Sequence, residues 1–586
     1  MNKITLLTSI LIIASVSCTK VEKADLILLN AEVYTMEEDQ PWASAIIISE
    51  NKIIAVLEND RTAMKYAGPD TRIADLEGKF VLPGFIDGHT HFDGTGAQLN
   101  DANLLAVADE AGLREEIARV VNILEDGDWI TRGLWGAYEQ WALGASGAGA
   151  GSGEKWMPDR QMIDDLTPDN PCLLWSFDRK WFLANTLAME ISGVDHMYPE
   201  DMVRDEQGRL TGLIRKGSPR LKDIQKVIQP KSHERLMDEN RAALKYLREC
   251  GIVEIHDITY PEQTKRFMEL EKNGELTCRI WMRPDLSRGA EMKEMGMTTG
   301  SHPGTGDPSR FLRYGALKGY IDGIMGTYGA LFFEPYDDQP ENYGHYRRHT
   351  SDDPDFRTGN MDKMYSLIKT GYDAGFVSNV HAIGTKGVSL MLDIYERLMT
   401  DLGRDLDGFR VIHAQVIRPE DFSRFKQLNV IAEVNPYHVS DDMRWMEERI
   451  GHERCKGAYA FRSLLDNGAT LSFGSDMPGT SAAEYFAHPK YLIHAAVNRT
   501  TLKGEPEGGW FPQEKITMEE ALKAYTINNA YAAFEADIRG SIKPGKLADI
   551  TVCDLNLMKI PPEDILKMNI EMTIVDGKIV YERAGN

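Results

Sequence analysis

The strongest constraint on the fold of this 586-residue chain is an alternation of apolar, strand-like segments with amphipathic, helix-like ones. Continuous apolar runs are typical of strands buried on both faces. Repeated βα units predict an α/β fold with a parallel sheet. Eight such units predict a closed (β/α)8 TIM barrel, with its active site at the carboxyl ends of the strands. The segments are residues 80–92, 251–258, 278–284, 315–323, 376–384, 409–415, 429–437 and 469–476.

The first segment, FVLPGFIDGHTHF at residues 80–92, delivers two histidines two positions apart. Residues i and i+2 of a strand lie on one face, so His89 and His91 project together while Thr90 packs elsewhere. Two imidazoles at a strand end can hold one metal ion. A coincidental pair in the core or on the surface explains the same spacing, so the decision depends on what the other strand ends carry.

Several other segments also carry residues that can bind a metal. An unpaired polar group inside an apolar run is costly, so each of them needs a partner. For any single histidine, a hydrogen bond in the core is the simpler interpretation, but convergence of six residues on one barrel mouth favours a metal site. The six are His89 and His91 on the first strand, Lys318 on the fourth, His381 on the fifth, His413 on the sixth and Asp476 on the eighth.

The two ends of the chain share a different sequence pattern, in which short strand-like segments are separated by turn residues. They lie at residues 26–36, 45–57 and 72–76, and again at 540–554 and 572–582. Neither set can bury both of its faces alone. We therefore expect residues 26–80 and 536–586 to pair into one β-sandwich flanking a barrel at residues 81–535.

An insertion at about residues 96–240 separates the first two barrel strands. Its Gly/Ala/Ser run at residues 144–153 predicts a flexible loop. Its tryptophans have two interpretations, a small hydrophobic core of its own or a lid that lends apolar surface to a substrate. They are Trp129, Trp135, Trp141, Trp156, Trp175 and Trp181.

Charge and cysteine usage exclude some functions. The formal net charge of −24 would repel nucleic acid and anionic lipid, which argues against binding of polyanions. The six cysteines show no C-x-x-C spacing, and we expect those after Cys18 to be mostly buried free thiols.

The first residues predict export. Residues 1–17 contain an early lysine, an apolar run and small residues before Cys18, a pattern typical of a secretory signal and short for a membrane span. The ending Ser15-Val16-Ser17-Cys18 resembles a bacterial lipoprotein cleavage box, with Ser15 where leucine is usual. We expect a signal peptide at residues 1–18 and a bacterial cell-envelope protein on the periplasmic side, anchored by lipid on Cys18. A soluble periplasmic protein is the alternative.

The motifs together resemble those of the amidohydrolase superfamily. PGFIDGHTH resembles its opening metal motif, and the G-x-I-x-x-G-x-x-A-D pattern at residues 540–549 resembles its return to the sandwich. LKGYIDG, EPYDD, HAIG, IHAQ and FGSDMP resemble the branch typified by YtcJ-like proteins and N-substituted formamide deformylase. The resemblance extends over residues 26–582. Two departures, Thr385 after HAIG and residues 178–180 where D-x-H is common, concern substrate specificity.

The resemblance implies a set of ligands and a reaction. It implies that Lys318 is N6-carboxylated and bridges two metal ions, and that His381, His413 and Asp476 complete the set. Imidazoles and carboxylates suit zinc and similar divalent ions, with one or two per chain. A metal-bound water then attacks the carbon of a C–N bond of amide or formamide type, with Asp476 as general base and then acid.

Other roles and functions stay open at this point. His256 and His438, on the second and seventh strands, are candidates to hold the carbonyl oxygen or orient the substrate, or are structural. A deaminase or another hydrolase with one metal is an alternative on the same scaffold, and a lipid-anchored binding protein without turnover is a second. The expected partners are a small amide-type molecule, no nucleic acid, the membrane only through the lipid anchor, and a second copy of the chain in a homodimer.

Overall fold

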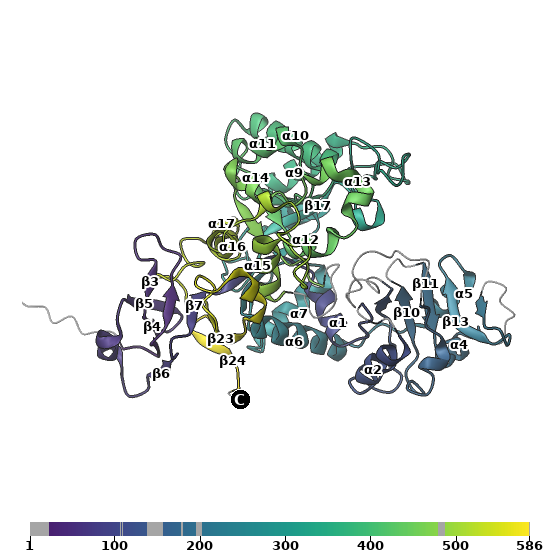
Figure 1. The fold of residues 1–586 in the computed structure, drawn as a ribbon, viewed down its shortest axis with the longest axis horizontal. Helices are drawn as coiled ribbons and strands as arrows, with labels where there is room; N and C mark the ends of the chain where they lie inside the picture. Colours follow the sequence, from purple (N-terminus) through teal and green to yellow (C-terminus); the bar gives the residue numbers. More distant parts are fainter. Residues whose placement is uncertain are drawn as a thin grey trace, which may run out of the picture.

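The computed structural model describes residues 23–105, 107, 109–136, 156–176, 180–194, 202–478 and 487–584. The predicted signal peptide with Cys18, the predicted loop at 144–153, Trp141 and residues 178 and 179 lie outside these ranges. Three parts are visible in Figure 1: strands from both chain ends on one side, a central part with its helices, and a lobe that follows α1 (Phe92–Leu99) on the other side.

The central part contains two sheets in which all strands run parallel. One sheet has the order β16–β15–β14–β8 and the other β17–β18–β19–β20–β21. The strands are β8 (Phe85–Thr90), β14 (Ile252–Ile258), β15 (Arg279–Arg283), β16 (Leu312–Tyr314), β17 (Ala316–Tyr320), β18 (Val377–Ala382), β19 (Arg410–His413), β20 (Ile431–Val434) and β21 (Leu471–Phe473).

The two parallel sheets approach each other at both edges. Gly315 alone separates β16 from β17, and a Cβ there would lie 2.0 Å from a ring atom of Trp281, so the chain passes from one sheet to the other where only glycine fits. Isolated parallel bridges join Asp285 to Lys318 and Thr90 to Met477. Within the described residues, the ladders are not joined into one closed sheet. The α/β class is confirmed, and closure into a barrel stays a prediction.

Amphipathic helices connect the strands. Many of them gather around the second sheet, whereas α7 (Pro261–Lys272) lies beside the first (Figure 1). In α10, buried apolar residues recur every three or four positions, at Val388, Met391, Leu392, Tyr395 and Leu398, which is the pattern of a helix packed on a sheet. The helices of this region are α7 (Pro261–Lys272), α8 (Gly289–Glu294), α9 (Met361–Asp373), α10 (Thr385–Leu402), α11 (Phe422–Gln427), α12 (Tyr437–Asp442), α13 (Met446–Cys455), α14 (Phe461–Asp466), α15 (Pro489–Asn498), α16 (Met518–Ala524) and α17 (Ile527–Ala532).

The first predicted barrel segment is in fact two strands that belong to different sheets. β7 (Phe80–Pro83) pairs with β22 (Ile550–Cys553) near the other end of the chain, whereas β8 joins the parallel sheet. Gly84 makes the break, because a Cβ there would lie 2.2 Å from a methyl carbon of Val253. The end sheet therefore extends to Pro83, three residues beyond the predicted boundary.

Strands from both ends of the chain form two further sheets. A four-stranded sheet has the order β5–β4–β1–β6, and a six-stranded sheet has the order β24–β23–β22–β7–β2–β3. Buried aliphatic residues of both sheets form one cluster. The strands are β1 (Leu26–Leu29), β2 (Glu32–Tyr34), β3 (Trp42–Ala43), β4 (Ala45–Ser49), β5 (Lys52–Leu57), β6 (Arg72–Asp75), β23 (Ile570–Val575) and β24 (Lys578–Glu582).

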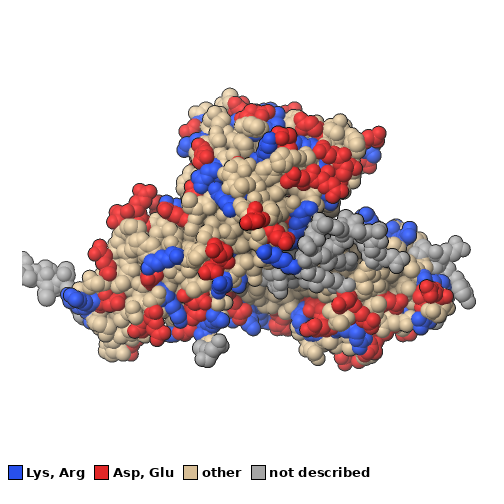
Figure 2. All heavy atoms as spheres, viewed as in Figure 1, with Lys and Arg blue, Asp and Glu red and all other residues tan. Residues whose placement is uncertain are grey.

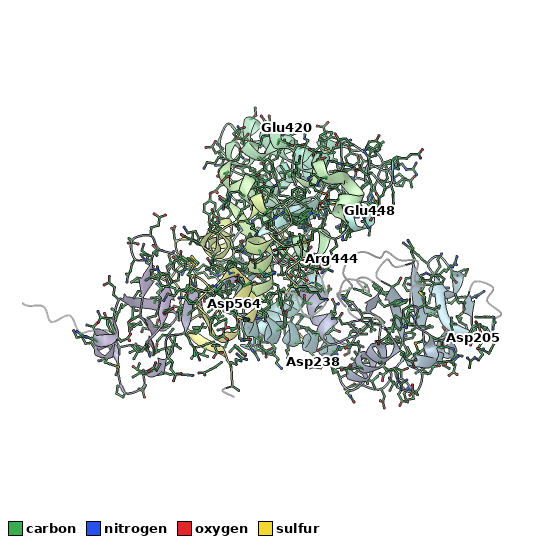
Figure 3. All side chains as sticks on the ribbon, viewed as in Figure 1. Asp205, Asp238, Glu420, Arg444, Glu448 and Asp564 are labelled. Carbon is green, nitrogen blue, oxygen red and sulfur yellow. The ribbon has the colours of Figure 1, made fainter. Side chains whose placement is uncertain are left out.

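The insertion forms a lobe with its own five-stranded sheet, in the order β12–β13–β11–β10–β9. The five tryptophans that the structure describes belong to, or pack against, its two hydrophobic clusters, which favours the interpretation as a core. Asp205, just after β12, lies at the far end of this lobe (Figure 3). The elements are α2 (Glu110–Val121), β9 (Gly133–Trp135), β10 (Leu173–Ser176), β11 (Trp181–Ala184), α4 (Thr186–Ser192), β12 (Met202–Arg204), β13 (Leu210–Arg215) and α5 (Pro219–Val227).

The surface agrees with the composition. Acidic and basic side chains are interspersed over the face shown in Figure 2. The five cysteines in the described ranges are buried and free, as predicted. Within those ranges, no helix is long and apolar enough to cross a bilayer.

A buried ion pair ties the central part to the end sheet. Arg279 of β15 donates from Nε and Nη2 to the carboxylate oxygens of Asp549, over 2.9 and 3.0 Å. Burial alone would raise the pKa of Asp549, but the charge and hydrogen bonds of Arg279 outweigh it and lower the pKa.

Because the pKa of Asp549 is lower in the folded chain, its stabilising effect is present above pH 4 and is lost as the pH falls through the folded pKa. We expect Asp549→Asn to cost about 3 kcal/mol at pH 7 and to flatten the loss of stability on acidification. Thermal unfolding between pH 7 and pH 3 measures both effects. Asp238→Asn, at an exposed ion pair on α6 (His233–Glu249), is the control; an equally steep acid response in the Asp549 variant would contradict the assignment.

Candidate metal centre

Two histidines and one aspartate meet at the carboxyl ends of β8 and β21. Nε2 of His89 lies 3.4 Å from Oδ1 of Asp476, and Nε2 of His91 lies 3.2 Å from the same oxygen. The His89 side chain is 1% exposed, whereas that of His91, at the start of α1 (Phe92–Leu99), is 39% exposed. The H-x-H pair therefore faces one carboxylate, from a buried and from an accessible side.

Two more histidines extend this group. The ring centroid of His413 lies 5.2 Å from that of His89 and 4.5 Å from that of His381. His89, His413 and Asp476 each offer a ligand atom, and these atoms lie within 4.8 Å of one another. The structure thus brings together five of the six predicted ligands at one end of the parallel strands.

Two of these residues adopt a backbone conformation that non-glycine residues rarely take. The φ angles are 71° at His413 and 58° at Asp476. Such conformations are costly and persist where the surroundings impose them. At Asp476 the restraint is visible, because its N–H donates to the His89 carbonyl over 2.8 Å and the His91 N–H donates to the Met477 carbonyl over 2.8 Å.

Partners behind the site orient the imidazoles. Nδ1 of His89 lies 2.6 Å from Oε1 of Glu433, and Nδ1 of His413 lies 2.6 Å from Oδ1 of Asn435. Each ring is thereby fixed through one nitrogen, so that Nε2 faces the centre of the group. Oxygen partners of this kind fix the tautomer of metal-binding histidines.

Glu433 is in turn held by two arginines. Nη1 of Arg283 donates to its two oxygens over 3.0 and 3.2 Å, and Nη1 of Arg410 donates to Oε2 over 2.8 Å. All three side chains are fully buried. Burial alone would raise the pKa of Glu433, but the arginine charges and the bond to His89 hold the pKa well below its usual range.

The surroundings of His89 and His413 favour their neutral forms. Burial, assisted by the charge of Lys318, lowers the pKa of His89 well below its usual value, and burial lowers the pKa of His413 to about 3. Burial would raise the pKa of Asp476, but His91 and His89 outweigh it and lower the pKa strongly. Neutral imidazoles beside an ionised carboxylate are the protonation states that a divalent ion requires.

Lys318, the sixth predicted ligand, lies in β17 with its side chain fully buried. Its Nζ has no hydrogen-bond partner among the described residues and lies 4.8 Å from the centre of the Tyr320 ring. Burial and the charge of Arg283 lower its pKa to about 7. A buried amine without a partner is costly, and native proteins rarely leave one in this state.

His438 and His256 occupy different places. His438, on α12, stacks against His413 with ring centroids 6.4 Å apart, and its Nε2 lies 3.9 Å from Oδ2 of Asp476. His256 is fully buried, with Nε2 3.1 Å from Oε1 of Glu254 and Nδ1 2.9 Å from Nη1 of Arg410. His438 therefore lies beside the ligand-type residues. Both ring nitrogens of His256 are occupied by Glu254 and Arg410, so His256 has a structural role instead.

Sequence reasoning missed the supporting residues Glu433, Asn435 and Asp322. Asp322 accepts hydrogen bonds from the N–H groups of Leu331 and Gly384, both over 2.9 Å. Its Oδ1 lies 3.4 Å from Nε2 of His381, so it braces the loop that follows that ligand. The sequence carries one signal that could have indicated such a residue, a single polar residue inside an apolar strand. Glu433 in the IAEV of β20 is an example.

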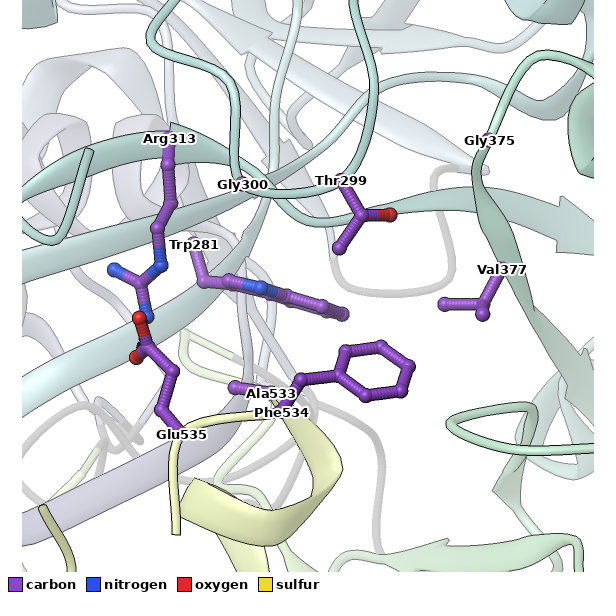
Figure 4. A pocket seen from close by; sticks show the side chains of 9 residues that line it. All are labelled: Trp281, Thr299, Gly300, Arg313, Gly375, Val377, Ala533, Phe534 and Glu535. Carbon is purple, nitrogen blue, oxygen red and sulfur yellow. Dashed lines mark hydrogen bonds and ion pairs between the residues drawn. The ribbon is translucent and has the colours of Figure 1, made fainter. Parts of the chain in front are cut away.

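A cavity of 380 Å³ lies elsewhere, at the amino-terminal ends of the strands (Figure 4). Val377, the first residue of β18, lines it, whereas His381 stands four residues further along the same strand. Trp281, Phe534 and the Arg313–Glu535 ion pair form other walls. This cavity is therefore separate from the candidate metal centre.

Ligand-type side chains at the carboxyl ends of parallel strands define a class of α/β proteins with a metal centre. This chain matches the amidohydrolase family over residues 72–581. Since that match covers most of the chain, the protein belongs to the amidohydrolase family, and its predicted resemblance to the YtcJ-like and N-substituted formamide deformylase-like branch is confirmed.

Full-length relatives support the same placement. The chain is 30% identical to Protein LONG AFTER FAR-RED 3 of Arabidopsis thaliana, over 95% of this chain and 92% of that protein. It is 26% identical to Putative amidohydrolase YtcJ of Bacillus subtilis (94% and 98%) and 25% identical to N-substituted formamide deformylase of Arthrobacter pascens (96% and 99%). An uncharacterized metal-dependent hydrolase from Pyrococcus furiosus superposes with a TM-score of 0.68 at 25% identity (91% and 100%).

Proposed function

We propose that this protein is a metal-dependent hydrolase that cleaves the C–N bond of a small amide or formamide. The observation that carries the proposal is the convergence of His89, His413 and Asp476 within 4.8 Å. The relative named N-substituted formamide deformylase supports the bond type. We further propose that the two parallel sheets form one closed (β/α)8 barrel, flanked by a sandwich of the end sheets.

The residues present fit a centre for one or two ions. His89, His91 and Asp476 would hold one ion, and His381 and His413 a second. Histidine and carboxylate ligands favour zinc. N6-carboxylation of Lys318 would remove the unpaired buried amine and add an anionic ligand between the two histidine groups. Bound metal lowers the pKa of water enough to supply hydroxide near neutral pH, and polarises the carbonyl of the substrate.

The chain's own residues supply proton transfer and positioning. Asp476 is ionised and its Oδ1 faces His89 and His91, so it is placed to take a proton from the attacking water and to pass it to the leaving nitrogen. His438 has a buried Nε2 without a hydrogen-bond partner in the described part of the chain, on the Oδ2 side of Asp476. We assign it to holding the substrate's carbonyl oxygen.

A second candidate is a deaminase or another hydrolase with a single ion. It is favoured by the fact that the three-residue cluster of His89, His413 and Asp476 can hold one ion without Lys318. A binding protein without turnover is a third candidate, and it gives no reason for Asp476 to be held in its rare conformation.

Metal content and activity together test the proposal. We expect about two metal ions per chain in protein purified without chelator in bicarbonate buffer. Many hydrolytic sites hold two ions close together, and the ligands here suffice for two. Lys318→Met should lower the count to about one. Elemental mass spectrometry gives the stoichiometry, and a panel of N-formyl amines and N-acyl compounds gives the activity.

Each outcome points to one candidate. One ion in the wild type, unchanged by Lys318→Met and accompanied by ammonia release from amino heterocycles, would replace the proposal by the deaminase. Bound ions without turnover of any compound would leave the binding protein. The matched control is Lys265→Met, which removes an exposed lysine of α7.

A further inference from the structure

Asn379, on β18, is a buried amide that the centre described above does not yet explain. Its side chain is fully buried, and neither Oδ1 nor Nδ2 has a hydrogen-bond partner among the described residues. Leaving both ends of a buried amide unpaired is costly, and native proteins rarely do so. The amide therefore points to a group that comes to it.

The residues beside Asn379 on the two neighbouring strands also carry buried polar atoms without a hydrogen-bond partner in the described ranges. Asn379 is the register partner of Lys318 on β17 and of Arg410 on β19, and partners in a parallel ladder project from the same face. Lys318 Nζ and Arg410 Nε are also buried without a partner in the described ranges. Three consecutive strands thus carry a row of unsatisfied polar atoms.

The hydrogen-bonding groups of Arg410 and Lys318, on the two neighbouring strands, decide how the Asn379 amide pairs. The Arg410 Nε–H can only donate, so an amide that pairs with it does so through its oxygen. In that orientation the Asn379 NH₂ group is left for the Lys318 side, where it requires an acceptor. A lysine ammonium has three donors and no acceptor, whereas a carboxylated lysine carries two acceptor oxygens.

We propose that Asn379 is the positioning residue for carboxylated Lys318, with its amide N–H donating to a carbamate oxygen and its Oδ1 accepting from Arg410. This inference rests on the proposed function. In the modification, the neutral amine of Lys318 attacks carbon dioxide and an N–C bond forms. One C=O π pair moves onto oxygen, and the amine proton leaves to water.

The test is a measurement of carboxylation on the full chain. Protein equilibrated with ¹³C-bicarbonate is examined by ¹³C NMR for a carbamate carbon, with Lys318→Ala as the variant that must lack it. We expect Asn379→Leu to raise the bicarbonate concentration for half-maximal labelling about tenfold or more, since one hydrogen bond to a charged group is lost. The metal content should fall in parallel.

Two further variants keep the test sharp if Asn379→Leu folds poorly. Asn379→Asp preserves the shape but pairs with the ammonium form of Lys318, so half-maximal labelling should again require a higher bicarbonate concentration. Ser378→Ala changes the adjacent residue, which projects from the opposite face, and should label as the wild type does.

The outcomes separate this inference from the proposed function. A labelled wild type with unchanged labelling in both Asn379 variants would overturn the role of Asn379 alone, and would mean that a buried water or a direct bond satisfies the amide. An unlabelled wild type that binds metal and turns over amides would remove carboxylated Lys318, and the role of Asn379 with it, while the hydrolase proposal stands. An unlabelled and inactive wild type would overturn both.

Discussion

Replacing Asp476 by asparagine is expected to lower kcat by about a thousandfold or more while KM changes little, because a positioned proton-transfer group contributes about 10²–10⁴ to the rate. The amide keeps the shape of the side chain and an oxygen for an ion, but it cannot take a proton. Steady-state kinetics on the best formamide or amide substrate, with the metal content of each sample, measures the effect.

Two controls accompany this variant. Asp564→Asn removes a carboxylate from the surface segment Pro562–Lys567, shown in Figure 3, and should leave kcat unchanged. His438→Gln should raise KM or lower kcat less than Asp476→Asn does. A metal-loaded Asp476→Asn protein with more than a tenth of the wild-type kcat would refute the assigned role.

Replacing Glu433 by alanine is expected to lower the free energy of unfolding of the central part by about 3–5 kcal/mol, because it leaves Arg283 and Arg410 as buried charges without their carboxylate. The affinity for metal should also fall about 10–100-fold, since His89 loses the partner that fixes its ring. Urea unfolding and metal titration measure the two effects separately.

Glu433→Gln is the matched control for this prediction. The amide keeps the volume and one acceptor oxygen, so we expect a smaller loss of stability than for alanine and a weakened hold on both arginines. A Glu433→Ala protein within 1 kcal/mol of the wild type would show that the arginines find other partners. If the Glu433→Ala protein keeps its stability but loses metal affinity, then Glu433 serves to fix the His89 ring and does not stabilise the two arginines.

The sequence predicted the strands of the central part closely. Apolar runs at 251–258, 278–284 and 376–384 correspond to β14, β15 and β18, because strands buried on both faces must be apolar along their length. The reading failed at residues 80–92, where one apolar run is two strands. No periodicity marks that break, because it depends on the contact between Gly84 and Val253, residues far apart in the chain.

The ligand-type residues could be named from the sequence, whereas the residues that support them could not. His89, His91, His381, His413 and Asp476 were named because they follow apolar segments and because their motifs resemble those of the family, and the structure places them at one end of the parallel strands. Glu433 and Asn435 could not, because a polar residue in or beside a strand acquires its role only from the atoms that meet it across the sheet. His256 shows the same limit, since two partners engage its ring well inside the sheet.

By itself, the sequence determined the α/β class, the pairing of the chain ends and the identity of the ligand-type residues, because these depend on local apolar patterns and on residue chemistry. The tertiary structure alone decided which of those residues share one carboxylate and which buried charges neutralise one another. It also decided which polar atoms are left without a partner. These properties arise between strands that are distant in sequence, where distances of a few ångströms set the free energy of each group.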